Sequence, residues 1–83
     1  MSSIEGYNWA PESKLEYSEH AEQRLRERRI SKADAEDTYR NPDITHPDDK
    51  GNPCYVKSFP DGRRVEVVIR AGSNPPFVIT VMD

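Results

Sequence analysis

Residues 63–70 have the sequence RRVEVVIR, in which apolar and polar side chains alternate as they do along a half-buried β-strand. The apolar face of this strand consists of Val65, Val67 and Ile69. Just upstream, Pro60-Asp61-Gly62 is typical of a turn, because proline restricts φ and glycine accepts a positive φ. The pattern therefore predicts a hairpin made of strands 54–59 and 63–70.

A third strand is predicted after the Gly- and Pro-containing turn at residues 72–76. Its period of two places Phe77, Ile79 and Val81 on one face. On the first strand, Tyr55, Lys57 and Phe59 alternate onto one face and Cys54, Val56 and Ser58 onto the other. The less apolar face of the second strand carries Arg64, Glu66, Val68 and Arg70, and that of the third carries Val78, Thr80 and Met82, so one sheet face is mixed polar. We expect these strands to form an antiparallel meander with one apolar face.

Two short helices are predicted before the strands. Ser18 is a suitable N-cap for a helix over 18–29, in which Ala21 and Leu25 form an apolar i, i+4 pair. Ser31 caps a second helix, which ends at Asn41-Pro42 because the residue before a proline is disfavoured in the helical region. The Pro-, Asp- and Gly-rich segment 42–53 is predicted to be a polar loop.

The element order α-α-β-β-β predicts an α+β fold with two N-terminal helices packed on a three-stranded antiparallel meander sheet. A chain of 83 residues is too short for more than one small core. We therefore expect one domain over residues 18–83, preceded by an irregular leader over 1–17. In the leader, Tyr7 and Trp9 are candidates for docking on the core or for contact with a partner.

Composition excludes several classes of protein. The longest apolar runs have only three residues, as in Val67-Val68-Ile69, far below the roughly 20 residues of a membrane span. We therefore expect a cytoplasmic protein that has no membrane span. A single cysteine, Cys54, excludes an internal disulfide and the familiar zinc spacings, so no metal and no cofactor are expected. A net charge of −3 argues against indiscriminate coating of nucleic acid, so any anion site is local.

A row of three side chains on the first helix is the strongest candidate for chemistry. His20, Arg24 and Arg28 are spaced i, i+4, i+8 and fall within about 80° of arc, beside the apolar pair. One titratable group and two fixed cations are thus expected at the rim where helix meets sheet. The alternative is a solvated helix face on which these arginines pair with neighbouring glutamates.

The predicted strands offer further polar groups. If they pair as a meander, Lys57, Arg70 and Thr80 can converge near the edge that carries His20, although register decides this. The alternative is a solvated sheet face with cross-strand ion pairs.

Residues 18–42 resemble a known bacterial family. They run from Ser-Glu-His-Ala-Glu-Gln-Arg through Arg-Arg-Ile-Ser to Asn-Pro, and resemble the pattern H-A-x-x-R-(x3)-R-G-I-(S/T) followed by a helix that ends in N-P. The pattern is that of a small domain of unknown function similar to DUF4258, within the barnase/RelE-like (BECR) ribonuclease-toxin superfamily. The likeness extends over about residues 17–82. Arg29 departs from the pattern, which usually has glycine there.

The resemblance implies a barnase/RelE-like fold and a metal-independent endoribonuclease toxin that cleaves RNA by attack of the 2′-OH. Carried over position by position, the catalytic residues would be His20, Arg24, Arg28 and Thr80, with Lys57 and Arg70 as less certain additions. Tyr55 and Arg64 are candidates for substrate binding. In this interpretation His20 acts as acid or base, and the arginines hold the phosphate.

The implied partners are a tRNA or mRNA substrate and a cognate antitoxin or immunity protein, in a toxin–antitoxin or contact-dependent competition system. Two alternatives remain open at this point. The Arg-rich helix could serve a binding module that docks on an acidic protein, or the chain could itself be an antitoxin or immunity protein.

Overall fold

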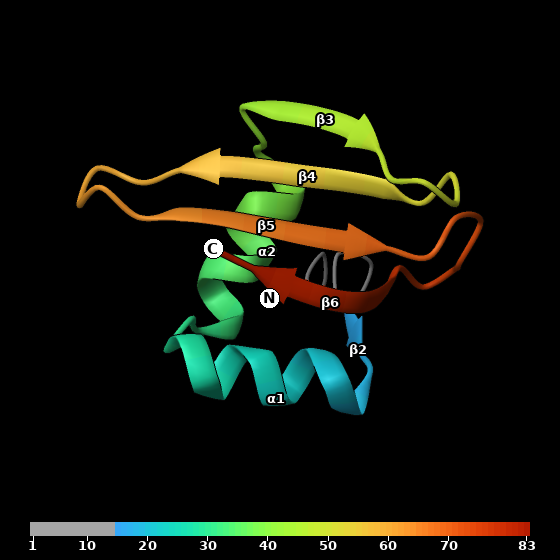
Figure 1. Cartoon of the computed structure of the whole chain (residues 1–83), viewed down its shortest axis with the longest axis horizontal. Coiled ribbons are helices and arrows are strands. Elements are labelled where there is room, and N and C mark those ends of the chain that lie inside the picture. The colour runs from blue at the N-terminus through green and yellow to red at the C-terminus, as the bar shows by residue number, and fades with distance from the viewer. Residues whose placement is uncertain (1–14) are drawn as a thin grey trace, which may run out of the picture.

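The computed structural model describes residues 15–83, which form two helices and a five-stranded mixed sheet (Figure 1). In chain order the elements are β2 (Glu16–Tyr17), α1 (Glu19–Arg28), α2 (Lys32–Arg40), β3 (Ile44–Pro47), β4 (Pro53–Ser58), β5 (Arg64–Ile69) and β6 (Phe77–Met82). The sheet order is β2-β6-β5-β4-β3. Strand β2 pairs with β6 in parallel, and the other pairs are antiparallel.

The predicted three-stranded antiparallel meander, with its barnase/RelE-like architecture, is therefore wrong in its sheet, although the α+β class and the element order are partly right. Strand β2 was missed because two residues are too short to show a period of two. Strand β3 was missed because all four of its residues are exposed and Pro47 ends it, so the segment resembles a loop. The prediction for the leader segment at Tyr7 and Trp9 lies outside the described residues.

Both helices begin and end by local capping. The hydroxyl of Ser18 accepts the backbone N–H of Ala21 at 2.9 Å, and that of Ser31 accepts the N–H of Asp34 at 3.0 Å, as predicted. Helix α1 ends at Arg29, which takes the left-handed conformation that glycine would supply, with φ 56°. The backbone N–H of the next residue, Ile30, then reaches the carbonyl of Leu25 at 2.9 Å.

The core lies between the helices and one face of the sheet. It consists of Leu15, Ala21, Leu25, Ile30, Ala35, Val65, Val67, Ile69, Val78 and Val81. The predicted apolar face of the third strand is wrong in part, because register shifts between Val68 and Ile69. This bulge turns Val78 into the core, where it is fully buried, and turns Ile79 toward the other face.

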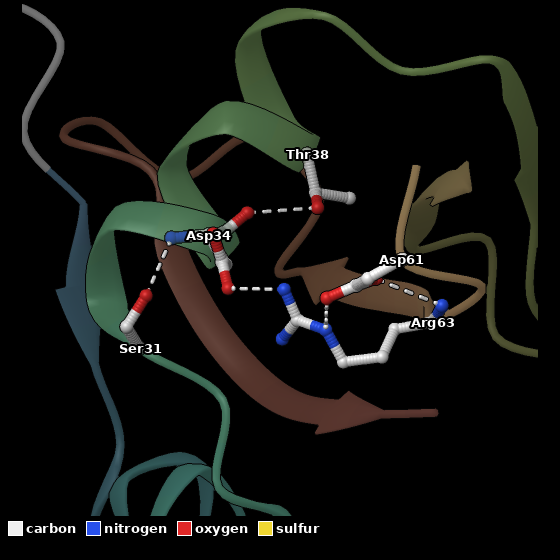
Figure 2. A network of polar contacts seen from close by, with 5 residues as sticks. All are labelled: Ser31, Asp34, Thr38, Asp61 and Arg63. Atoms are coloured by element: carbon white, nitrogen blue, oxygen red, sulfur yellow. Dashed lines mark hydrogen bonds and ion pairs between the residues drawn. The ribbon is translucent and has the colours of Figure 1, made fainter. Parts of the chain in front are cut away.

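A polar network ties the β4–β5 hairpin to α2 (Figure 2). Arg63 lies 2.9 Å from Oδ2 of Asp34 through Nη2, and 2.8 Å from Oδ2 of Asp61 through Nε. Within α2, the buried hydroxyl of Thr38 donates to the carbonyl of Asp34 at 2.8 Å. Arg63 thus joins the hairpin turn to the first turn of α2.

Neither α1 nor α2, the helices of residues 15–83, has the length and apolar character that crossing a membrane requires.

Candidate functional site

The sheet has a second face, opposite α1 and α2, which we call the far face. Residues that pair directly across antiparallel strands share a face, so the register defines its rows. One row runs across β3, β4, β5 and β6 through His46, Cys54, Val68 and Thr80. The adjacent row runs through Ile44, Val56, Glu66 and Met82.

The far face contains a shallow hollow of about 640 Å³, within the range of small-ligand sites. Its ionisable lining includes His46 on β3, Glu66 on β5 and Arg70, which follows β5. Thr80 adds a hydroxyl from β6, and Asp48, Asp49, Lys50 and Asn52 line it from the β3–β4 turn. The hollow therefore gathers acids, bases and a hydroxyl from β3, β5, β6 and the β3–β4 turn.

His46 and Glu66 face one another in the hollow. Nε2 of the imidazole lies 3.6 Å from Oε2 of the carboxylate. Nδ1 of His46 lies 3.2 Å from the carbonyl oxygen of Pro47. A carbonyl only accepts hydrogen bonds, so this contact is a hydrogen bond when Nδ1 carries a proton, and Nε2 then faces Glu66. The pair is thus oriented to exchange a proton or to share a cation.

Cys54 is the cross-strand partner of His46 and is almost fully buried, with 2% of its surface exposed. Burial, reinforced by the negative charges of Glu66 and Asp48, raises the pKa of its thiol to about 11. The thiol is therefore protonated at neutral pH and is a poor nucleophile there.

Asp48 organises the turn at the end of the hollow. Oδ1 accepts the backbone N–H of Asn52 at 2.8 Å and that of Lys50 at 2.8 Å. The bond from Asn52 is the main cause that lowers the pKa of the Asp48 carboxyl. The side chain of Asn52 also accepts the N–H of Ala71, which links this turn to the one after β5.

Two of the residues predicted from the sequence, Arg70 and Thr80, lie in the hollow. The guanidinium of Arg70 stacks on the ring of Phe77, 4.5 Å from its centroid, so the cation is held at the rim. Thr80 pairs with Val68 in the same row as His46.

His20, Arg24 and Arg28 stay together on one flank of α1. The opposite flank carries Glu22, whose carboxylate lies 3.4 Å from Nζ of Lys32 at the start of α2. The predicted row therefore faces away from α2. Arg24 pairs with Glu27 at 3.6 Å and Arg28 with Asp83 at 3.7 Å, whereas His20 is exposed. None of the three lines the hollow as described over residues 15–83.

The remaining predicted residues lie elsewhere. Lys57 and Tyr55 point to the helix face: the Lys57 ammonium donates to the carbonyl of Asn41 at 3.2 Å, and the Tyr55 ring contacts Tyr39 with centroids 5.0 Å apart. Arg64 pairs with Ser58 near the hairpin turn and is exposed, outside the hollow. The strands therefore do not bring Lys57 together with Arg70 and Thr80. Lys57 lies on the helix face of the sheet, whereas Arg70 and Thr80 lie on the far face.

The family model of a domain of unknown function, DUF4258, matches residues 17–83. The chain belongs to this family. No curated protein and no solved structure matches it. The DUF4258 match spans both the hollow and the row of His20, Arg24 and Arg28, which we call the α1 row, so both are parts of one domain.

Sequence reasoning missed His46, Glu66 and Cys54 as members of one site. The register brings His46 opposite Cys54, and Glu66 lies one row from both. The available signal was the alternation that separates Cys54 from Tyr55 and Lys57 and places Glu66 on the less apolar face of its strand; which faces combine depends on register. Nothing comparable marked His46, because its strand was predicted to be a loop.

Proposed function

We propose that this DUF4258 domain is an endoribonuclease whose chemistry takes place in the hollow of the far face. The observation that carries the proposal is the His46–Glu66 pair, 3.6 Å apart and flanked in the same hollow by Arg70 and Thr80. The motif at residues 18–42, which resembles ribonuclease toxins, supports RNA as the substrate.

The proposed reaction is attack of the ribose 2′-OH on the adjacent phosphorus. The carboxylate of Glu66 takes the 2′-OH proton as the new O–P bond forms, and the imidazolium of His46 gives its proton to the departing 5′ oxygen. The products are a 2′,3′-cyclic phosphate and a 5′-hydroxyl. After the reaction Glu66 carries a proton and His46 is neutral, and proton exchange with water returns both groups to their starting states.

Arg70 and Thr80 complete the proposed site. The guanidinium lies at the rim, where it would contact a phosphate through charge-assisted hydrogen bonds. The Thr80 hydroxyl would donate to a phosphoryl oxygen. Fixed donors aimed at the charge that develops on the phosphorane lower the barrier without reorganisation.

The α1 row supplies positive charge outside the hollow. His20, Arg24 and Arg28 share one flank, and they would contact the RNA backbone rather than perform proton transfer. Because the hollow also contains Asp48 and Asp49 and the net charge is −3, RNA binding should depend strongly on these local cations and fall steeply with salt.

The two histidines of the chain allow a matched test. The purified protein is incubated with total RNA and the cut ends are mapped for 2′,3′-cyclic phosphate. His46→Ala and Glu66→Gln should each lower the cleavage rate by about 100-fold or more, and His20→Ala by less than about tenfold. Circular dichroism and melting curves check that each variant is folded.

The reverse result, with His20→Ala inactive and His46→Ala active, would move proton transfer to the α1 row and overturn the site proposed for the hollow. Absence of cleavage by the folded protein across total RNA would overturn the ribonuclease assignment and favour a binding module.

The toxin role is part of the same proposal. Expression in bacteria should arrest growth unless a cognate inhibitor is present, and the Glu66→Gln variant should be tolerated. Such an inhibitor would most economically present carboxylates to the arginines of the α1 row, in place of RNA phosphates. Unimpaired growth with the folded wild-type protein would contradict the toxin role.

A further inference from the structure

Three potential metal ligands from adjacent strands lie within a small volume of the far face. The ligand atoms of His46, Cys54 and Glu66 are all within 4.8 Å of one another. His46 and Cys54 are direct cross-strand partners, and Glu66 reaches the same point from β5. The backbone of a hydrogen-bonded sheet fixes these three positions, so the cluster does not depend on a flexible loop.

The distances suit a small tetrahedral ion. Neighbouring ligand atoms around tetrahedral zinc are expected about 3.4–3.6 Å apart, from bond lengths of about 2.0–2.3 Å. Nε2 of His46 and Oε2 of Glu66 already lie 3.6 Å apart. Small side-chain rotations would bring the buried sulfur of Cys54 to the third position.

The orientation of the imidazole is that of a metal ligand. The contact of Nδ1 with the carbonyl of Pro47 fixes the ring so that Nε2 faces Glu66. In the neutral imidazole with its proton on Nδ1, two lone-pair atoms then face one another, and either a proton on Nε2, as in the proposed reaction, or a metal cation relieves their repulsion. Metal-ligating histidines commonly donate their second ring nitrogen to a carbonyl in this way.

Charge at the cluster also favours a cation. Glu66 and Asp48 place negative charge near the Cys54 sulfur. A thiol, an imidazole and one carboxylate form a mixed S, N and O set that suits zinc, whereas magnesium and calcium prefer oxygen ligands alone. The fourth position would open into the hollow, where water or another small ligand can enter.

We infer that His46, Cys54 and Glu66 bind one Zn²⁺ ion at the far face of the sheet. The site itself does not depend on RNA being the substrate. Its effect on cleavage rests on the proposed function: zinc would occupy the lone pairs that the His46–Glu66 pair needs for proton transfer, and would therefore inhibit the ribonuclease.

The test uses the whole chain, freed of metal with a chelator and then titrated with Zn²⁺ in a calorimeter. We expect one ion per chain, with binding weakened at least about tenfold by Glu66→Gln, His46→Ala or Cys54→Ser. Titration with Co²⁺ should give a thiolate charge-transfer band that Cys54→Ser abolishes. His20→Ala, which changes the other histidine, should bind as the wild type does.

Failure of the wild-type protein to bind zinc in competition with a weak chelator would overturn the inference, as would equal binding by the wild type and the three ligand variants. Loss of binding in His20→Ala would show that the ion sits on another surface. Zinc binding by a protein whose metal-free form cleaves no RNA would leave the metal site standing and reject the proposed function. RNA cleavage by a protein that does not bind zinc would support the proposed function and overturn the metal site.

Discussion

At the scale of single residues, Tyr17 shows how burial and charge act on one side chain. Its ring is half-buried against the core, and Nζ of Lys32 lies 5.0 Å from the ring centroid. Burial, reinforced by the negative charges of Glu36 and Glu22, raises the pKa of its hydroxyl to about 12. The hydroxyl therefore stays protonated in the folded protein at pH values where it ionises in the unfolded chain.

The consequence is a loss of stability at alkaline pH. Between the ordinary pKa of 10.0 and about 12, the folded state holds a proton that the unfolded state has released, so the free energy of unfolding falls as pH rises. Tyr17→Phe removes this contribution and should make the decline above pH 10 shallower. Urea unfolding at a series of pH values measures the slope, and equal slopes for the two proteins would contradict the expectation.

At the scale of elements, the end of α1 stores a small conformational cost. Arg29 occupies the left-handed region at φ 56° and ψ 44°, which is unfavourable for a residue with a Cβ atom. Arg29→Gly should therefore raise the free energy of unfolding by up to about 1 kcal/mol. The neighbouring change Arg28→Gly, inside the helix, should lower it by about 1 kcal/mol. Urea unfolding measures both, and destabilisation by Arg29→Gly would contradict the role of the cap.

The network of Arg63 connects two elements and makes a second prediction at this scale. Arg63→Ala removes the ion pairs with Asp34 and Asp61 and the contact with Phe59, whose centroid lies 5.1 Å from the guanidinium carbon. The melting temperature should fall, and the difference should shrink at high salt because the groups are partly exposed. Arg64→Ala, at the adjacent exposed position, is the matched control and should leave the melting temperature nearly unchanged.

At the scale of the whole molecule, the inferred zinc site should couple to global stability. An ion that binds only the folded state adds about 2.7 kcal/mol at a free concentration 100 times its dissociation constant. The ion must displace the proton of Cys54, whose pKa is raised to about 11, so this gain should decrease as pH falls. Melting curves with and without Zn²⁺ at two pH values test both points, with Cys54→Ser as the variant that should show no gain.

The predictions from sequence succeeded where the signal is local. The caps at Ser18 and Ser31 and the hairpin turn at Pro60-Asp61-Gly62 are confirmed, because each depends on residues within one turn of chain. The row of His20, Arg24 and Arg28 is also a local feature, since helical periodicity alone places it on one flank. The predicted convergence of this row with Lys57, Arg70 and Thr80 depends on strand register, which is not a local feature. In the structure Lys57 lies on the helix face, and Arg70 and Thr80 line the hollow, which the row does not reach.

What the amino-acid sequence determined by itself is the two capped helices, the hairpin of β4 and β5, and the apolar face of β5, because periodicity and capping act between near neighbours. The tertiary structure alone decided the edge strands β2 and β3, the bulge that buries Val78, and the meeting of His46, Cys54 and Glu66. Strand pairing brings together residues that are distant in the chain. A shift of one residue in register would send each side chain to the other face, so no local pattern contains that information.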